Sequence, residues 1–155
     1  PDTAILGGIP KEAGICEEVK KSVPGVRAVH FPISGCCRFH AYIAIDKQVD
    51  GEGKVAAIAA LPYHDELKLV IVVDKDIDVF NEREVLWAVA TRVQASEAVD
   101  IIKGVRGGSL DPSSTIHAVG DKILIDATKP VSRPFPERIR VPDEVMREIK
   151  LADWI

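Results

Sequence analysis

The chain has 155 residues, of which 46% are apolar and 28% are charged, a balance typical of one globular domain. Its 20 basic and 24 acidic side chains are interspersed and give a net charge of −4, so no basic stripe is available for nucleic acid. The longest apolar stretches, such as Val55–Leu61 and Leu69–Val73, are too short to span a membrane. The first residues lack a basic segment followed by an apolar one, so we do not expect secretion. Three cysteines, two of them adjacent, cannot form a secreted disulfide framework, so we expect a cytoplasmic protein.

The first part of the chain predicts a helix followed by two paired strands. Pro10 is typical of the first helical position, so we expect a helix over Lys11–Ser22. Val26–Ile33 has the β-branched composition of a strand, and Phe39–Asp46 alternates well enough to be its antiparallel partner.

The middle of the chain predicts a central strand between two helices. An Ala-rich helix is expected over Val55–Leu61, and Leu67–Val73 is apolar on both faces, as a central strand should be. After the acidic segment Asp74–Asp78, Asn81 is a favourable N-cap, and Glu84 completes the spacing of a capping box. The apolar face of this second helix is predicted to consist of Val85, Leu86, Ala88, Val89 and Val93.

The C-terminal part predicts two further strands, an extended arm and a terminal helix. The strands are expected over Val99–Val105 and Lys122–Asp126, with a long loop over Arg106–Gly120 between them. Four prolines between Lys129 and Pro142 indicate an extended arm over the surface. A short helix over Asp143–Leu151 follows, because acidic residues at its start favour the positive end of a helix.

The predicted order of elements, α-β-β-α-β-α-β-β-α, indicates a single α/β domain with a mixed sheet and helices packed on it. We divide the chain into an α/β domain over residues 1–128 and an arm with a terminal helix over residues 129–155. Ligands of open α/β sheets bind outside the carboxyl ends of strands. We therefore expect the Asp74–Asp78 and Arg106–Gly120 loops to face a ligand.

The loop that begins at Arg106 is the most informative local segment. Its glycines allow close approach of the backbone to a ligand, its serines supply hydroxyl donors, and Arg106 can hold a carboxylate or phosphate. The alternative is a long surface turn that begins at Asp111 and Pro112. Long loops in compact domains are more often functional, so we favour the first interpretation.

Two other clusters have simpler explanations. Asp74, Asp76 and Asp78 are spaced like calcium ligands, but Val79 stands where the loop requires glycine, so no metal site is expected. Cys36 and Cys37 with His40 lack the second ligand pair that zinc requires, and buried inert thiols are the default. A thiol-dependent or metal protein built on these three residues remains an alternative. The residues alone assemble no catalytic constellation.

Several segments, taken in order, resemble the C-terminal region of UbiD-type decarboxylases. The resemblance covers nearly the whole chain, because each segment matches a family motif with the family's order and spacing. The matching segments are Ser34–Cys37 with His40, Leu69–Asn81, Val85–Arg92, Arg106–Ser113 and Asp126–Lys129.

This resemblance implies a carboxy-lyase that reversibly decarboxylates aromatic or α,β-unsaturated carboxylic acids without oxidation. Typical substrates are quinone precursors such as 3-octaprenyl-4-hydroxybenzoate of ubiquinone biosynthesis and, in archaea, an unsaturated phosphate derived from mevalonate. The family uses prenylated FMN with a divalent metal (Mn or Mg) and potassium. The cofactor and the catalytic Arg-Glu-Glu set lie mainly in a preceding split β-barrel domain. We therefore carry over no catalytic or metal-binding residue, and we do not expect this chain alone to bind the cofactor.

The resemblance also implies which residues approach the substrate and the cofactor. They are Arg106, Gly107, Ser109, Asp111, Pro112 and Ser113 of the loop, together with Lys129. The arm and the segment Asp143–Ile155 are implied to dock on a neighbouring subunit of a homo-oligomer. The leading interpretation is a C-terminal enzyme domain that is inactive apart from its barrel domain. The alternative is a stand-alone module that recruits a decarboxylase subunit and performs no chemistry.

Overall fold

The computed structural model describes residues 2–139 and 141–148 and contains a five-stranded mixed sheet in the order β1-β2-β3-β5-β4. The strands are β1 (Val26–His30), β2 (His40–Ile45), β3 (Leu69–Asp74), β4 (Val99–Arg106) and β5 (Val119–Ala127). The helices are α1 (Asp2–Lys20), α2 (Glu52–Ala60), α3 (Glu82–Arg92), α4 (Ala95–Ala98) and α5 (Asp143–Glu148), with short 3-10 turns at Ile33–Gly35 and Leu61–Tyr63. The predicted α/β class and mixed sheet are confirmed, whereas the short helix α4 was not indicated by the sequence.

The strand directions explain how the sheet is built. β2, β3 and β5 run parallel, whereas β1 pairs antiparallel with β2 and β4 pairs antiparallel with β5. The predicted pairing of the first two strands and the central place of β3 are therefore confirmed. Val70 and Val72 of β3 pack in one core cluster, and Ile71 and Val73 pack in the other.

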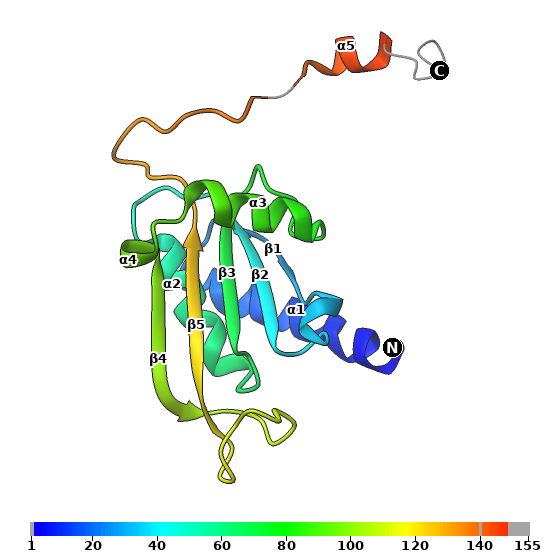
Figure 1. Cartoon of the computed structure of the whole chain (residues 1–155), viewed down its shortest axis with the longest axis vertical. Helices are drawn as coiled ribbons and strands as arrows, with labels where there is room; N and C mark the ends of the chain where they lie inside the picture. The colour runs from blue at the N-terminus through cyan, green and yellow to red at the C-terminus, as the bar shows by residue number, and fades with distance from the viewer. Residues whose placement is uncertain (1, 140, 149–155) are drawn as a thin grey trace.

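Helices cover both faces of the sheet, but unequally (Figure 1). On one face, α1 and α2 pack over the strands and bury a large cluster that includes Ile15, Val19 and Leu124. On the other face, α3 packs over β3 and β5, and it buries a smaller cluster around Val85 and Ala88. The sheet therefore has one fully covered face and one that is covered only in part.

The first helix is longer than predicted, because α1 begins at Asp2 and contains Pro10 in its interior. Proline removes one helical hydrogen bond and disfavours the helix interior. The side chains before it are exposed, Leu6 by 68% and Ile9 by 56%. Water therefore has access to this part of α1, which lessens the cost of the missing bond.

The start of α3 is set by Asn81, as predicted, because the Asn81 side chain accepts a hydrogen bond from the Arg83 amide at 3.2 Å. The second hydrogen bond of the predicted capping box, from the Asn81 amide to the Glu84 side chain, does not form. Glu84 accepts instead from the Asp78 amide at 3.3 Å, and the Asn81 amide donates to the Asp78 carbonyl. Leu86 was predicted on the apolar face but is 52% exposed, because the buried stripe runs through Val85 and Ala88.

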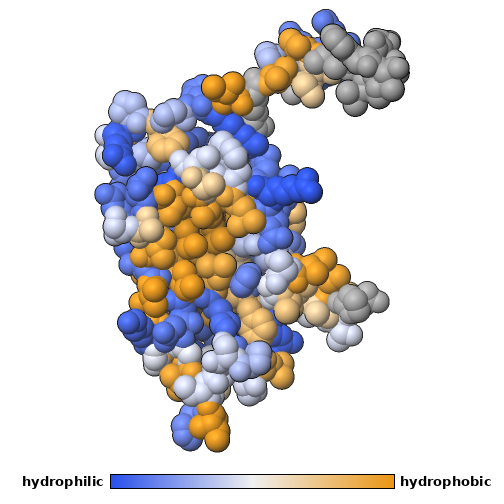
Figure 2. Space-filling model, viewed as in Figure 1, coloured by the Kyte–Doolittle hydropathy of each residue, from blue (hydrophilic) through white to orange (hydrophobic). Residues whose placement is uncertain are grey.

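The partly covered face exposes an apolar area next to α3. Leu69, Ile123 and Ile101 are paired in one row across β3, β5 and β4, and Ile125 lies one row further along. Ile101 is 57% exposed and Ile123 is 41% exposed. We call Leu69, Ile101, Ile123 and Ile125 the open sheet face; Figure 2 shows a broad hydrophobic area over these strands.

After β5 the chain forms the extended arm that was predicted, and the arm carries α5 away from the body of the domain (Figure 1). The arm and α5 expose Ile139, Val141, Val145 and Met146, which are 99%, 53%, 45% and 56% exposed. The terminal helix ends at Glu148 within the described residues, and the rest of its predicted range lies outside them. Among the described helices, none combines the length and the apolar character needed to cross a membrane.

Candidate functional site

The carboxyl ends of the three parallel strands meet at one edge of the sheet, where charged side chains surround a cavity. The residues that follow β2, β3 and β5 all contribute to it, and its volume is about 240 Å³. It is lined by Ile45, Asp46, Lys47, Asp74, Lys75, Asp76, Lys129, Pro130 and Val131. This is the edge at which ligands of open α/β sheets bind, and the acidic Asp74–Asp78 segment lies there as predicted.

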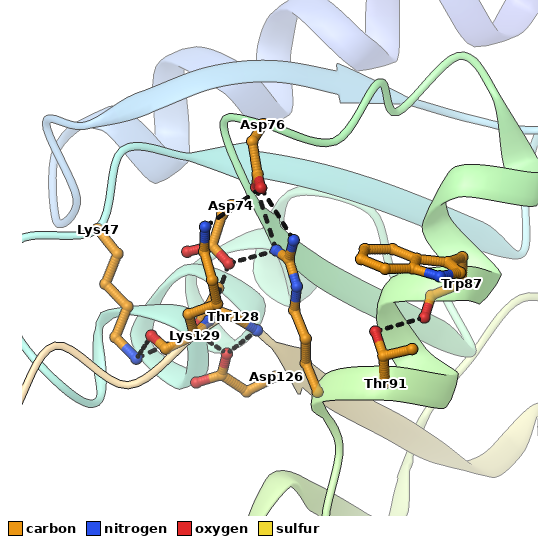
Figure 3. A network of polar contacts seen from close by, with 9 residues as sticks. Lys47, Asp74, Asp76, Trp87, Thr91, Asp126, Thr128 and Lys129 are labelled. Atoms are coloured by element: carbon orange, nitrogen blue, oxygen red, sulfur yellow. Dashed lines mark hydrogen bonds and ion pairs between the residues drawn. The ribbon is translucent and has the colours of Figure 1, made fainter. Parts of the chain in front are cut away.

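Arg92, the last residue of α3, connects this edge into one network (Figure 3). Its guanidinium donates to Asp74 at 2.5 Å and holds Asp76 with two hydrogen bonds, at 2.9 Å and 3.1 Å. The backbone amide of Lys129 also donates to Asp74, at 2.8 Å, and the Lys129 side chain reaches Asp76 at 3.2 Å. Three segments far apart in the sequence are therefore fastened together at one point.

A second part of the network fastens the start of the arm (Figure 3). The side chain of Lys47 is only 6% exposed, and its ammonium group donates to the Thr128 hydroxyl and the Lys129 carbonyl, both at 3.0 Å. Asp50 takes the third contact of this ammonium group at 3.0 Å. Asp126 accepts from the amide and the hydroxyl of Thr128, at 3.1 Å and 2.5 Å. The network therefore determines the direction in which the arm leaves β5.

Burial and charge act differently on the two central carboxylates. Burial raises the pKa of Asp74, and the hydrogen bond from the Lys129 amide and the charge of Arg92 offset part of that rise. Burial also acts to raise the pKa of Asp76, but the hydrogen bond and charge of Arg92 outweigh it and lower that pKa. Because their oxygens face guanidinium and ammonium groups, both carboxylates act here as structural anchors rather than metal ligands.

The Arg106 loop does not lie at this edge. β4 runs antiparallel to β5, so the loop that follows Arg106 lies at the opposite end of the sheet, beside the first residue of β3 (Figure 1). The two loops that the sequence indicated as places for a ligand therefore lie at opposite ends of the sheet. Lys129, which follows β5, lies at the other edge from the remaining predicted site residues.

The loop itself is folded around Asp111, which is 9% exposed. Lys68 donates to Asp111 and to the Ser113 hydroxyl, at 3.0 Å and 2.6 Å, and the Ser113 amide also donates to Asp111 at 2.9 Å. Burial acts to raise the pKa of Asp111, but the hydrogen bonds from Ser113 and Lys68 outweigh it and lower the pKa. Ser109 and Pro112 are exposed at the surface of the loop.

The loop residues, as they stand in the described part of the chain, do not fit a flavin phosphate on their own. The Gly107 amide donates to the Ala118 carbonyl at 2.7 Å, and a side chain at Gly108 would overlap with Glu66. These glycines therefore allow close packing within the protein. Arg106 is 87% exposed in its side chain and lies 3.5 Å from Asp65. Among the described residues, no group of three His, Cys, Asp or Glu side chains is arranged for a metal ion.

The cysteines lie in a tight turn rather than in a strand. Cys36 and Cys37 follow a 3-10 turn and both have positive φ angles, 58° and 52°. Cys36 is exposed and Cys37 is buried in the core cluster below α1, so the two thiols point into different environments. His40 begins β2, and its neighbour across the sheet is Leu69. This geometry gives no support to a metal or thiol site formed by the three residues.

A comparison with known proteins identifies the domain. The family described as the 3-octaprenyl-4-hydroxybenzoate carboxy-lyase C-terminal domain matches residues 4–127, which is most of the chain. The chain belongs to the UbiD family. The resemblance drawn from the motifs is thereby confirmed.

Full-length members of the UbiD family are similar to this chain over one region of their length. Anhydromevalonate phosphate decarboxylase of Methanothermobacter thermautotrophicus is 44% identical over 83% of this chain and 30% of its own length. Gallate decarboxylase of Lactiplantibacillus plantarum is 31% identical over 96% of this chain and 32% of its own length. The solved UbiD-class enzyme HmfF of Pelotomaculum thermopropionicum, in complex with FMN, is 45% identical with a TM-score of 0.90. It is matched over 99% of this chain and 34% of its own length. The chain thus spans about a third of these relatives.

One polar cluster of this UbiD domain was missed by sequence reasoning. The Tyr42 hydroxyl and the Ser34 hydroxyl both donate to Glu82, at 2.6 Å and 2.5 Å. Burial, followed by the hydrogen bond to Glu82, raises the pKa of Tyr42 to about 12. Tyr42 and His40 lie on the same side of the sheet as the open sheet face. No local signal identifies this cluster, because its members are separated by up to 48 residues.

Two partly buried histidines give the UbiD domain a predicted sensitivity to mild acid. Burial lowers the pKa of His40, with Glu82 opposing and Lys68 adding to the effect. Burial also lowers the pKa of His64, which Lys11 reinforces and Glu66 opposes. At pH values between the lowered pKa and the ordinary pKa of 6.5, each of these histidines therefore binds more protons in the unfolded chain than in the folded chain.

Stability is accordingly expected to fall as the pH falls below about 6.5, by at most about 1.4 kcal/mol per pH unit for each histidine. Urea unfolding at several pH values measures this slope. The double variant His40→Gln with His64→Gln should flatten it, whereas His117→Gln, at an exposed position, should leave it unchanged. An equal slope in the wild type and the double variant would contradict the prediction.

Proposed function

We propose that this chain acts as the C-terminal domain of a UbiD-type carboxy-lyase and completes an enzyme whose prenylated FMN is held by another domain. The supporting observation is the match over residues 4–127 to a C-terminal domain that makes up only about a third of its relatives. The named relatives decarboxylate anhydromevalonate phosphate or gallate. They favour an unsaturated phosphate or an aromatic acid as substrate over a precursor of ubiquinone.

The open sheet face supports docking of this domain on the cofactor-bearing domain. Ile123 on the inner strand β5 and Ile101 on the edge strand β4 are 41% and 57% exposed, on a sheet whose opposite face is covered by two helices. Contiguous apolar areas of this kind mark interaction surfaces, because burying them removes apolar area from water. The cofactor-bearing domain is the favoured occupant, since the relatives carry about two-thirds of their length beyond the matched region.

Two other segments are assigned roles in the same proposal. The loop exposes Arg106, Leu110 and Ile116, which are available to contact the substrate side of a docked domain. The arm over residues 129–139 and α5 are proposed to dock on a neighbouring subunit, because this segment extends away from the body of the domain (Figure 1) and exposes apolar side chains. This proposal keeps the division of the chain into an α/β domain over residues 1–128 and a docking segment over residues 129–155.

A chimeric enzyme tests the proposal. This chain replaces the matched third of HmfF, and carbon dioxide release is measured with prenylated FMN and a panel of unsaturated and aromatic acids. We expect activity in the chimera, and at least about a tenfold loss when Ile101→Asp and Ile123→Asp place carboxylates in the docked surface. The matched control is Ile58→Asp, because Ile58 is 49% exposed on α2, away from the open sheet face.

The outcomes separate the competing interpretations. A folded chimera that binds flavin yet releases no carbon dioxide from any acid would favour the stand-alone module without chemistry. Activity that is unaffected by both aspartates would reject the open sheet face as the docking surface and leave the family role intact. Flavin binding by this chain alone would contradict the proposed division of labour.

A further inference from the structure

A second cavity lies between α3 and the arm, and Arg92 and Lys129 of the network described above contribute to its lining. Its volume is about 180 Å³. Trp87, Phe135 and Pro136 provide apolar walls, and Arg92, Lys129 and Arg138 bring three positive side chains to it. The combination of an apolar wall and convergent cationic groups is the usual composition of a site for a small acid.

Trp87 lies close to two guanidinium groups. The central carbon of the Arg138 guanidinium is 4.3 Å from the centre of the Trp87 ring, and that of Arg92 is 5.4 Å away. Both contacts are within the range of cation–π attraction, which holds each guanidinium against the indole. Because Arg138 belongs to the arm and Trp87 to α3, these contacts also close the arm over the cavity.

Each guanidinium has a buried nitrogen that forms no hydrogen bond with the described residues. These groups are the Nε of Arg92, whose side chain is 2% exposed, and Nη1 of Arg138. Nη1 of Arg138 lies 3.2 Å from a Glu84 oxygen as an ion pair, but the contact lacks the geometry of a hydrogen bond. A buried donor without an acceptor is unfavourable, and two donors at one cavity are an unusual coincidence.

We propose that this cavity binds a small free carboxylic acid in its ionised form. A carboxylate offers two oxygen acceptors in one plane and can satisfy guanidinium donors with charge-assisted hydrogen bonds. Arg92 and Lys129 also pair with Asp76, and Arg138 lies 3.2 Å from Glu84. A bound carboxylate would therefore take up the guanidinium donors that these pairs leave without a hydrogen bond. The indole of Trp87 and the ring of Phe135 suit a short alkyl or planar substituent. All residues that line this cavity belong to this chain, so binding of the acid does not require the cofactor-bearing domain.

Fluorescence of Trp87 tests the proposal directly. The chain has two tryptophans, so Trp154→Phe leaves Trp87 as the single reporter. Sodium butyrate is titrated at constant ionic strength, with neutral butyramide and sodium chloride as comparison solutes. We expect a saturable change in emission with butyrate and no saturable change with the other two. Arg138→Gln should weaken butyrate binding at least about tenfold, because one charged donor is lost.

The matched control is Arg133→Gln, on the same arm but outside this cavity; it should leave the butyrate affinity unchanged. Circular dichroism of each variant verifies that the fold is retained. Equal responses to butyrate and butyramide, or no saturable response at all, would mean that the cavity holds only water and would overturn the proposal. An unchanged affinity in Arg138→Gln would also overturn it.

Discussion

Replacement of Arg92 by leucine is expected to lower the free energy of unfolding by about 3–5 kcal/mol, because it removes one partner of a buried ion pair. The Arg92 side chain is 2% exposed, and it neutralises both Asp74 and Asp76. Asp74 is itself 8% exposed, so without Arg92 it would be left as a buried charge that retains only the hydrogen bond from the Lys129 amide. Leucine fills part of the space but offers no donor.

Thermal and urea unfolding measure this effect, and a loss of this size corresponds to a fall in Tm of roughly 6–20 °C for a chain of this length. The matched control is Arg27→Leu. Arg27 donates to Asp46 at 2.6 Å, but its side chain is 59% exposed, so its loss should cost no more than about 1 kcal/mol. Equal destabilisation by the two substitutions would show that burial of the Arg92 network is not what stabilises the domain.

Gly53→Ala is expected to destabilise the domain by about 1–3 kcal/mol, although alanine normally favours a helix. Gly53 lies in the first turn of α2, where its bare backbone allows the Asp126 carboxylate to approach. A methyl group at this position would overlap with that carboxylate, which Thr128 holds at 3.1 Å and 2.5 Å. The substitution therefore disturbs both the helix N-terminus and the network behind it.

Gly7→Ala provides the comparison for this prediction. Gly7 lies inside α1, and a methyl group there would meet nothing within 4 Å. The same substitution should therefore stabilise the domain there, by up to about 1 kcal/mol, through helix propensity alone. Urea unfolding of the two variants should give changes of opposite sign. If Gly53→Ala were also stabilising, the close approach of Asp126 would not be a constraint on the fold.

The parts of the fold that were predictable depend on local patterns. The apolar run before Asp74 identifies β3, and the spacing around Asn81 locates the start of α3. Neither requires knowledge of distant residues. The early start of α1 was missed because Pro10 is a strong local signal for a helix N-terminus. α1 continues through Pro10 because the residues before it are exposed to water. The local sequence does not show which residues will be exposed.

The site was predictable in its parts but not in its assembly. The motifs containing Asp74, Arg92 and Lys129 were recognised through a family resemblance, yet their convergence on one ion-pair network depends on tertiary contacts. The sequence did not show that the Arg106 loop and Asp74 lie at opposite ends of the sheet, because strand direction was unknown. The sequence of β4 is equally compatible with either direction, and the antiparallel pairing with β5 decides where the loop lies.

The order of the strands in the sheet has a consequence for how this domain matures on the ribosome. β5 is the last strand in the sequence, yet it occupies an inner position between β3 and β4. A nascent chain that has emerged only as far as residue 118 therefore has β3 with one unpaired edge and β4 with no partner. Exposed strand edges of this kind are templates for wrong pairing. The five-stranded sheet can therefore be completed only after Val119–Ala127 has been synthesised and has paired with both β3 and β4.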